Sequence, residues 1–136
     1  MTLILAVDYG SKNIGLALSD ESGTIANPRE VISHVSRIVD AASVAERAEA
    51  YSATHIIVGV SYDEEGRPNP AGRSALRFIE ALKMQTPLAV ENWDESLTTQ
   101  DARAARISMN TSRKKRSGHM DNLAATVLLQ SYLDSK

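Results

Sequence analysis

The sequence predicts an α/β fold in which a mixed, five-stranded sheet carries helices on both faces. Its 136 residues suit one domain, residues 1–136, with one hydrophobic core. Two short apolar runs, residues 3–7 and 55–60, are typical of strands that are buried on both faces. Turn signals and then a helical pattern lie between the two runs, so the sheet must combine hairpins with helix crossovers.

The first quarter of the chain is expected to form an antiparallel meander of three strands. The first strand ends at Asp8, and residues 11–13 are expected to form a hairpin turn. Gly15 in the return strand permits a close backbone approach. Turn signals at Ser22-Gly23 and Asn27-Pro28 precede the third strand. The expected strand ranges are 3–7, 14–18 and 31–35.

Helices and strands alternate in the rest of the chain. Residues 36–52 have an apolar stripe that begins at Ile38 and continues through alanines, which predicts an amphipathic helix. Asn69 and Pro70 suit the N-cap and the first position of a second helix. Crossover helices place the later strands, 55–60 and 88–90, parallel to the first. The expected helices are 36–52, 70–85, 98–107 and 118–133.

Composition excludes several classes of protein. The chain has no cysteine, which rules out disulfide scaffolds, zinc–thiolate sites, iron–sulfur clusters and thiol nucleophiles. No apolar run approaches the roughly 18 residues that a membrane helix needs, and Met1 leads directly into a strand, so we expect a cytoplasmic protein. Aromatic residues make up 4%, which argues against a base-stacking platform. With a net charge of −2, any nucleic-acid contact requires a local basic patch.

Three acidic positions are the strongest functional signal. Asp8 directly follows a buried strand, and the pair Asp94-Glu95 follows the last strand. The carboxyl ends of parallel strands share one edge of a sheet, where open α/β sheets bind ligands. Asp121 heads the core-facing stripe of the last helix. We therefore expect Asp8, Glu95 and Asp121 to meet at this edge, with Asp94 in reserve should the strand end one residue differently.

Acids gathered at one edge repel one another unless a cation lies between them. Oxygen-only ligands suit Mg²⁺ or Mn²⁺. A pair of such ions can activate water and stabilise the leaving oxygen in phosphodiester cleavage. Each acid also has an ordinary interpretation, as a strand-end carboxylate or, for Asp121, as a partner of the helix dipole.

The strongest charge asymmetry in the sequence precedes Asp121. Residues 102–120 hold six Lys or Arg and no Asp or Glu. A solvated face is the ordinary meaning of such a run, but its place beside Asp121 favours a grip on a phosphate backbone. His34 and His55 are expected to be structural or solvent-facing. The candidate phosphate contacts are Lys12, Arg113, Lys114, Lys115, Arg116 and His119.

The residues resemble the YqgF family, also called RuvX, over essentially the whole chain. The order and spacing of several short motifs carry the resemblance. The sequence departs from the family pattern at Ser96, where Arg is usual, at Asn122, where Lys is common, and at Ser61-Tyr62. The matching motifs are Asp8-Tyr9-Gly10-Ser11-Lys12 with Ile14-Gly15, Val58-Gly59, Asp94-Glu95 with Leu97-Thr98-Thr99, Arg113-Lys114-Lys115, and Asp121 with Leu123-Ala124-Ala125.

The resemblance implies a ribonuclease H-like fold and a metal-dependent nuclease with Asp8, Glu95 and Asp121 as its catalytic acids. It implies processing of the 5′ end of pre-16S rRNA, with structured rRNA precursors and ribosomal particles as partners. Two alternatives stay open: Holliday junction resolution on branched DNA, and a non-catalytic nucleic-acid-binding module in ribosome assembly. A symmetric junction would require a homodimer, whereas one rRNA end is compatible with a monomer. The hairpin also resembles that of actin-like ATPases and sugar kinases, but those proteins clamp nucleotide between two related domains.

Overall fold

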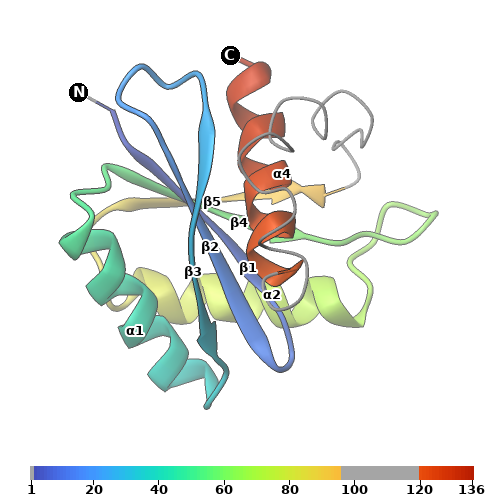
Figure 1. Ribbon diagram of the computed structural model, residues 1–136. Helices are drawn as coiled ribbons and strands as arrows, with labels where there is room; N and C mark the ends of the chain where they lie inside the picture. Colours follow the sequence, from blue (N-terminus) through green and yellow to red (C-terminus); the bar gives the residue numbers. More distant parts are fainter. Residues whose placement is uncertain (1, 96–119) are drawn as a thin grey trace.

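The computed structural model describes residues 2–95 and 120–136, with side chains in the last helix from residue 123 onward. The described residues form a five-stranded sheet in the order β3-β2-β1-β4-β5, flanked by helices on both faces (Figure 1). The strands are β1 Ile4–Tyr9, β2 Asn13–Ser19, β3 Ala26–Ser33, β4 His55–Val60 and β5 Ala89–Asp94. The helices are α1 Arg37–Ala50, α2 Pro70–Lys83 and α4 Met120–Asp134.

The sheet is mixed, as the element order predicts. β2 pairs antiparallel with β1 and with β3, whereas β4 pairs parallel with β1 and with β5. The helix crossovers α1 and α2 make the later strands parallel to β1. The carboxyl ends of β1, β4 and β5 therefore share one edge of the sheet, which we call the carboxyl edge.

The alternation of side chains along the strands divides the core into two layers. Leu5 and Val7 of β1 face α1 and α2, and they pack with Phe78 and Leu82 of α2. Ile4 and Ala6, on the opposite face, pack under α4. The α4 face includes Ile57, Ala125, Leu128, Leu129, Tyr132 and Leu133. Any residue that continues the even-numbered series of β1 therefore points toward the α4 side.

Two strands are longer than the sequence predicts. β3 begins at Ala26, so Asn27-Pro28 lies in a strand and not in a turn. Pro28 is tolerated because β3 is an edge strand, and the register shifts between Leu16 and Ala17 opposite it. β5 continues past Val90 to Asp94, since its parallel pairing with β4 extends to the pair Val60 and Asp94.

α2 begins where its predicted capping residues place it, but one residue of α1 is assigned wrongly to the buried stripe. Ser36 caps α1 and Asn69 caps α2, with Pro70 at its first position. Ile38, expected on the buried stripe of α1, is 70% exposed, because α1 packs through Ala41, Val44 and Ala48 instead. The helix expected at 98–107 lies outside the described residues. No helix in the described part of the chain has the length and apolarity needed to span a membrane.

Candidate active site

Asp8 is the penultimate residue of β1, where the pleat of the strand sets the direction of its side chain. It pairs with Gly15 of β2. Because Ile4 and Ala6 face α4, Asp8 continues the same series and points toward the α4 side of the carboxyl edge. The sequence places Asp8 just after the strand, whereas the structure includes it in the strand.

Glu95 lies over the neighbouring strand, at Gly59 of β4. A Cβ atom on Gly59 would stand 2.7 Å from Oε1 of Glu95 and 3.0 Å from Cδ2 of Leu128. The last register pair between β1 and β4 is Val7 and Val58, and Asp8 and Gly59 each follow by one residue. Adjacent strands lie about 4.8 Å apart, so Glu95 covers the strand next to Asp8 on the same face of the sheet.

The surroundings of Glu95 disfavour its charged form. Burial raises the pKa of the Glu95 carboxyl, and the negative charge of neighbouring Asp94 raises it further. Both causes act against the ionised carboxylate. A cation bound at this carboxylate would oppose both of them.

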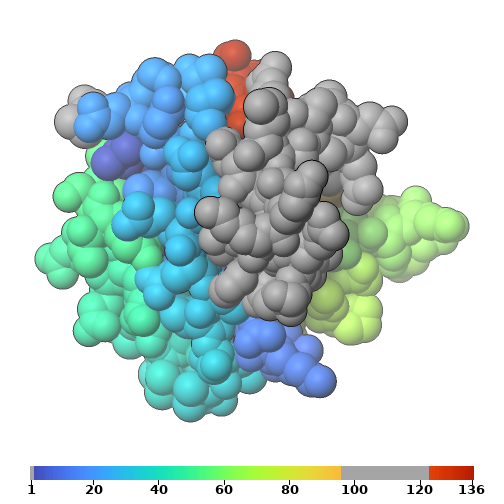
Figure 2. All heavy atoms as spheres, viewed as in Figure 1, coloured from blue at the N-terminus to red at the C-terminus, as the bar shows by residue number. Residues whose placement is uncertain are grey.

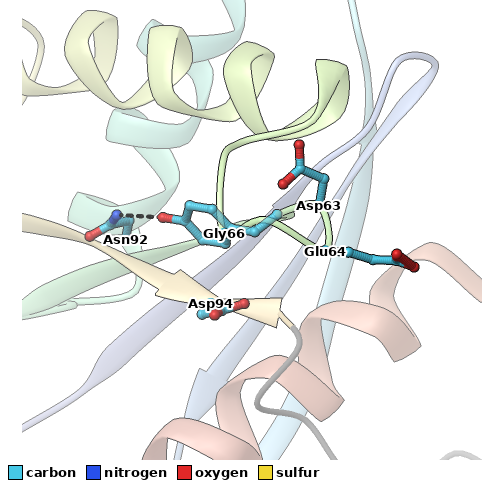
Figure 3. Close-up of a pocket in the computed structure, with 6 residues that line it drawn as sticks. Asp63, Glu64, Gly66, Asn92 and Asp94 are labelled. Carbon is cyan, nitrogen blue, oxygen red and sulfur yellow. Dashed lines mark hydrogen bonds between the residues drawn. The ribbon is translucent and has the colours of Figure 1, made fainter.

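Asp94 points to the other face of the sheet. Trp93, between Asp94 and Asn92, faces α4, where its Nε1–H donates to Oγ of Ser131 at 3.2 Å. Asp94 and Asn92 instead line a hollow of about 530 Å³ beside the loop between β4 and α2 (Figure 3). The carboxylates labelled in Figure 3 point in different directions and do not converge. Asp94, the reserve ligand, is therefore on the opposite face from Glu95. The remaining lining residues are Tyr62, Asp63, Glu64 and Gly66.

The backbone of α4 brings Asp121 toward the carboxyl edge. Tyr132 and Leu133 lie beside Thr2 and Ile4 at the amino end of β1, whereas Leu128 lies over Gly59 farther along the sheet. α4 therefore runs opposite to β1, as Figure 1 shows. Asp121 precedes Leu128 by seven residues, about 10 Å along the axis, on the same helix face. The side chain of Asp121 lies outside what the structure describes.

The candidate phosphate contacts are described only in part. Lys12 is exposed in the β1–β2 turn, and its backbone carbonyl accepts a hydrogen bond from His34 N–H at 2.9 Å. Figure 2 shows this turn projecting from the lower edge of the molecule and the β4–α2 loop projecting at the right. Arg113, Lys114, Lys115, Arg116 and His119 lie outside the described residues, as does Ser96.

A metal ion at this edge would have oxygen ligands. Among the side chains that the structure describes, in residues 2–95 and 123–136, no three His, Cys, Asp or Glu gather closely enough to hold a metal ion together, and Asp121 is not among these residues. The described residues nonetheless place Asp8 and Glu95 on one face, and Asp121 begins the helix that covers it. Carboxylate oxygens are ligands that Mg²⁺ and Mn²⁺ prefer, so this donor set fits such an ion.

Sequence reasoning missed two features near Asp8. Gly59 makes room for Glu95. A glycine inside a buried strand indicates the close approach of another group, and this signal could have pointed to the contact. Asp40 is 1% exposed and accepts hydrogen bonds from Tyr9 and Val35, but no local pattern marks these distant residues as partners. His34 also contacts Asp40, on the face opposite α4, and the exposed His55 bonds to Thr54 at the amino end of β4, so neither histidine lies at the carboxyl edge with Asp8.

Sequence comparison links the chain to a described group of nucleases. A family model described as "RuvX: Holliday junction resolvase" matches residues 2–135. A protein of Bacillus cytotoxicus named "Putative pre-16S rRNA nuclease" is 39% identical over 135 residues, covering 98% of each chain. A protein of the same name from Desulforudis audaxviator is 33% identical over 133 residues, covering 98% of this chain and 94% of its own length.

Two solved structures share the fold. RuvC of T. thermophilus in complex with a Holliday junction substrate superposes with a TM-score of 0.66 at 12% identity, covering 99% of this chain and 95% of RuvC. The Fowlpox virus resolvase in complex with Holliday junction DNA gives a TM-score of 0.61 at 18% identity, covering 98% of each chain. At these identities the likeness concerns the fold alone, which is ribonuclease H-like.

Proposed function

This chain belongs to the RuvX family, and from that premise we propose that it is a divalent-metal-dependent nuclease that processes the 5′ end of pre-16S rRNA. Nuclease activity follows from the family, and the rRNA substrate from the names of its relatives. The observation that carries the proposal is the placement of Glu95 over Gly59, one strand away from Asp8 on the α4 face of the carboxyl edge.

Asp8, Glu95 and Asp121 are the proposed ligands of Mg²⁺ or Mn²⁺. When bound, such an ion would lower the pKa of a coordinated water molecule and stabilise the negative charge on the leaving oxygen of the phosphodiester. Asp8 offers its carboxylate from a strand that is paired on both sides, so the ligand direction is set before metal binding. The Glu95 carboxyl has a raised pKa and holds a proton more readily than an ordinary glutamate when no cation is present.

The proposed substrate contacts are Lys12, which follows Asp8 in sequence, and a basic run that precedes Asp121. Lys12 belongs to the exposed turn that follows β1, close to Asp8 along the chain. Arg113, Lys114, Lys115, Arg116 and His119 are proposed to contact phosphates, because the family likeness includes part of this run and the chain otherwise has few concentrated positive charges. Such contacts hold a polyanion without reading its sequence.

Resolution of four-way DNA junctions is the second candidate function. The description of the family and the resolvase fold of the similar structures favour it. Phosphodiester chemistry is common to both substrates, so the acids support either one. If the substrate is pre-16S rRNA, the protein would act in the cytoplasm on ribosomal particles.

A cleavage assay with matched asparagine variants tests the proposal. We would incubate the protein with pre-16S rRNA 5′ fragments and with four-way junctions, with and without Mg²⁺ or Mn²⁺. The control is Asp63→Asn, because Asp63 lies in the β4–α2 loop, where its Oδ1 accepts N–H bonds from Glu65 and Arg67. We expect cleavage of rRNA by the wild type and by Asp63→Asn, and at least about 100-fold less by Asp8→Asn.

Three outcomes would contradict the proposal, the third in its substrate alone. Equal cleavage by the wild type and Asp8→Asn would remove Asp8 from the reaction. Binding of pre-16S rRNA without cleavage under any metal condition would favour the non-catalytic module. Cleavage confined to four-way junctions would keep the chemistry and replace the substrate.

A further inference from the structure

A buried polar cluster lies on the face of the sheet opposite the candidate active site. At its centre is Asp40, in the first turn of α1, which is 1% exposed. Asp40 accepts the phenolic O–H of Tyr9 at 2.8 Å and the backbone N–H of Val35 at 2.9 Å. Nδ1 of His34 lies 2.5 Å from Oδ2 of Asp40, the same oxygen that accepts the hydrogen bond from Tyr9. A carboxylate this deeply buried persists because its oxygens are satisfied.

The ring of Tyr9 is held from two directions. It stacks on Phe78 of α2, with ring centroids 4.1 Å apart and planes 14° from parallel. Phe78 is fully buried, so this support does not move easily. Burial and the bond to Asp40 both raise the pKa of Tyr9 above its ordinary value, so its hydroxyl remains a donor at alkaline pH as well as at neutral pH.

Tyr9 directly follows Asp8 in β1, so fixing one residue constrains the other. Side chains alternate along a strand, and Tyr9 packs on the α1 and α2 side while Asp8 points to the α4 side. The neighbours of Asp8 across the two strand pairs are Gly15 and, by extension of the register, Gly59. Neither glycine places a side chain beside Asp8, and Glu95 occupies the space over Gly59. The backbone of β1 sets the direction of the Asp8 carboxylate.

The same cluster holds the turn that carries Lys12. The backbone N–H of His34, whose ring contacts Asp40, donates to the carbonyl of Lys12 at 2.9 Å. Within the turn, Gly10 N–H donates to the carbonyl of Asn13 at 3.0 Å. Asp40 is therefore linked to β1 through Tyr9 and to the β1–β2 turn through His34.

We infer that Tyr9 and Asp40 are positioning residues for Asp8, acting through the backbone of β1 from the opposite face of the sheet. The inference rests on the proposed function, because it assigns these residues to metal binding and cleavage at Asp8. Partners that orient metal ligands commonly change metal affinity or activity by about 10- to 100-fold when they are altered. An assembly that only stabilised the fold would change the melting temperature without a specific effect on the metal requirement.

The test compares two tyrosines that each donate to a carboxylate: Tyr9 bonds to Asp40 in the first turn of α1, and Tyr51, at the carboxyl end of α1, bonds to Glu30 of β3. Tyr9→Phe keeps the ring on Phe78 and removes the bond to Asp40, and Asp40→Asn alters the same bond from the other side. Tyr51→Phe is the control, since Tyr51 follows the carboxyl end of α1 and donates to Glu30. For each variant we would measure kcat, KM, the Mn²⁺ concentration for half-maximal rate and the melting temperature.

We expect Tyr9→Phe and Asp40→Asn to lower kcat about 10-fold and to raise the Mn²⁺ requirement, with KM for the nucleic acid within about 2-fold. Tyr51→Phe should keep wild-type kcat and Mn²⁺ requirement at a comparable melting temperature. If Asp8→Asn abolishes cleavage but Tyr9→Phe matches Tyr51→Phe, the inference is overturned and the proposed function stands. If Asp8→Asn cleaves like the wild type, the proposed function fails and the inference fails with it.

Discussion

The Glu95 carboxylate lies against Gly59, so close that a Cβ atom on residue 59 would stand 2.7 Å from Oε1. The contact places an acid from the end of β5 over the strand next to Asp8. It explains why a glycine occupies a buried strand, where any side chain on the α4 face would meet Glu95 and Leu128. This pair of residues therefore determines the geometry of the candidate site.

Gly59→Ala should displace Glu95 and reduce activity. We expect the Mn²⁺ concentration for half-maximal cleavage to rise roughly 10- to 100-fold, because the methyl group would stand 2.7 Å from Oε1 and force the carboxylate to move. The contact with Leu128 should also lower stability by about 1–3 kcal/mol, measured by urea unfolding. A variant with a wild-type Mn²⁺ requirement would show that Glu95 does not need its position over Gly59.

Glu95→Gln and Asp94→Asn should differ sharply in cleavage. Asp94 and Glu95 are adjacent in sequence, but only Glu95 lies over Gly59, and Asp94 lines the hollow on the other face. We expect Glu95→Gln to lose at least about 100-fold in rate and Asp94→Asn to stay within about 3-fold of the wild type. The reverse order of activities in the same assay would make Asp94 the ligand.

Glu95→Gln should raise the melting temperature of the metal-free protein at pH 7. The pKa of Glu95 is raised on folding, so the native state binds its proton more tightly than the unfolded chain does. Ionisation of Glu95 therefore lowers the free energy of unfolding. This loss is absent below the ordinary glutamate pKa, grows as the pH rises between the ordinary and the raised pKa, and is complete above the raised pKa. Differential scanning calorimetry at pH 7 should show the gain, and at about pH 4 the two proteins should converge. A gain that persisted at pH 4 would assign the effect to packing.

Gln130→Leu should destabilise the attachment of α4. Gln130 is fully buried, its Oε1 accepts the N–H of Ala26 at 3.0 Å, and its Nε2 donates to the carbonyl of Thr24 at 2.9 Å. Leucine would leave both backbone groups without this partner, a cost of about 2 kcal/mol in urea unfolding. Gln85→Leu, at an exposed position, is the matched control and should change stability by less than about 0.5 kcal/mol. Equal effects of the two substitutions would contradict this role.

The elements with strong local patterns could be predicted from the sequence. β1 and β4 are continuous apolar runs, and α2 begins after the predicted cap Asn69, with Pro70 at its first position. β5 was predicted too short, because Glu91 and Asn92 are exposed on an edge strand and give no apolar signal. The start of β3 was predicted too late because Asn27-Pro28 resembles a turn in the sequence. An edge strand, however, tolerates a residue without an N–H donor.

The candidate site could be predicted as a set of acids but not as a geometry. Strand-end logic placed Asp8 and Asp94-Glu95 at one edge, yet which of the two acids faces α4 depends on where β5 ends. The contacts of Glu95 with Gly59 and of Asp40 with Tyr9 join residues that are more than 30 positions apart. Sequence periodicity carries no information about such pairs, because they arise from packing of whole elements.

The most direct test of the account is the position of a bound ion in crystals soaked in Mn²⁺. Anomalous scattering should place Mn²⁺ on the α4 face of the carboxyl edge, within about 2.0–2.4 Å of carboxylate oxygens of Asp8 and Glu95. Crystals of Asp8→Asn should lose this peak, and those of Asp94→Asn should retain it. An ion bound instead in the hollow beside Asp94, or no ion at Asp8 and Glu95 at saturating Mn²⁺, would contradict the account.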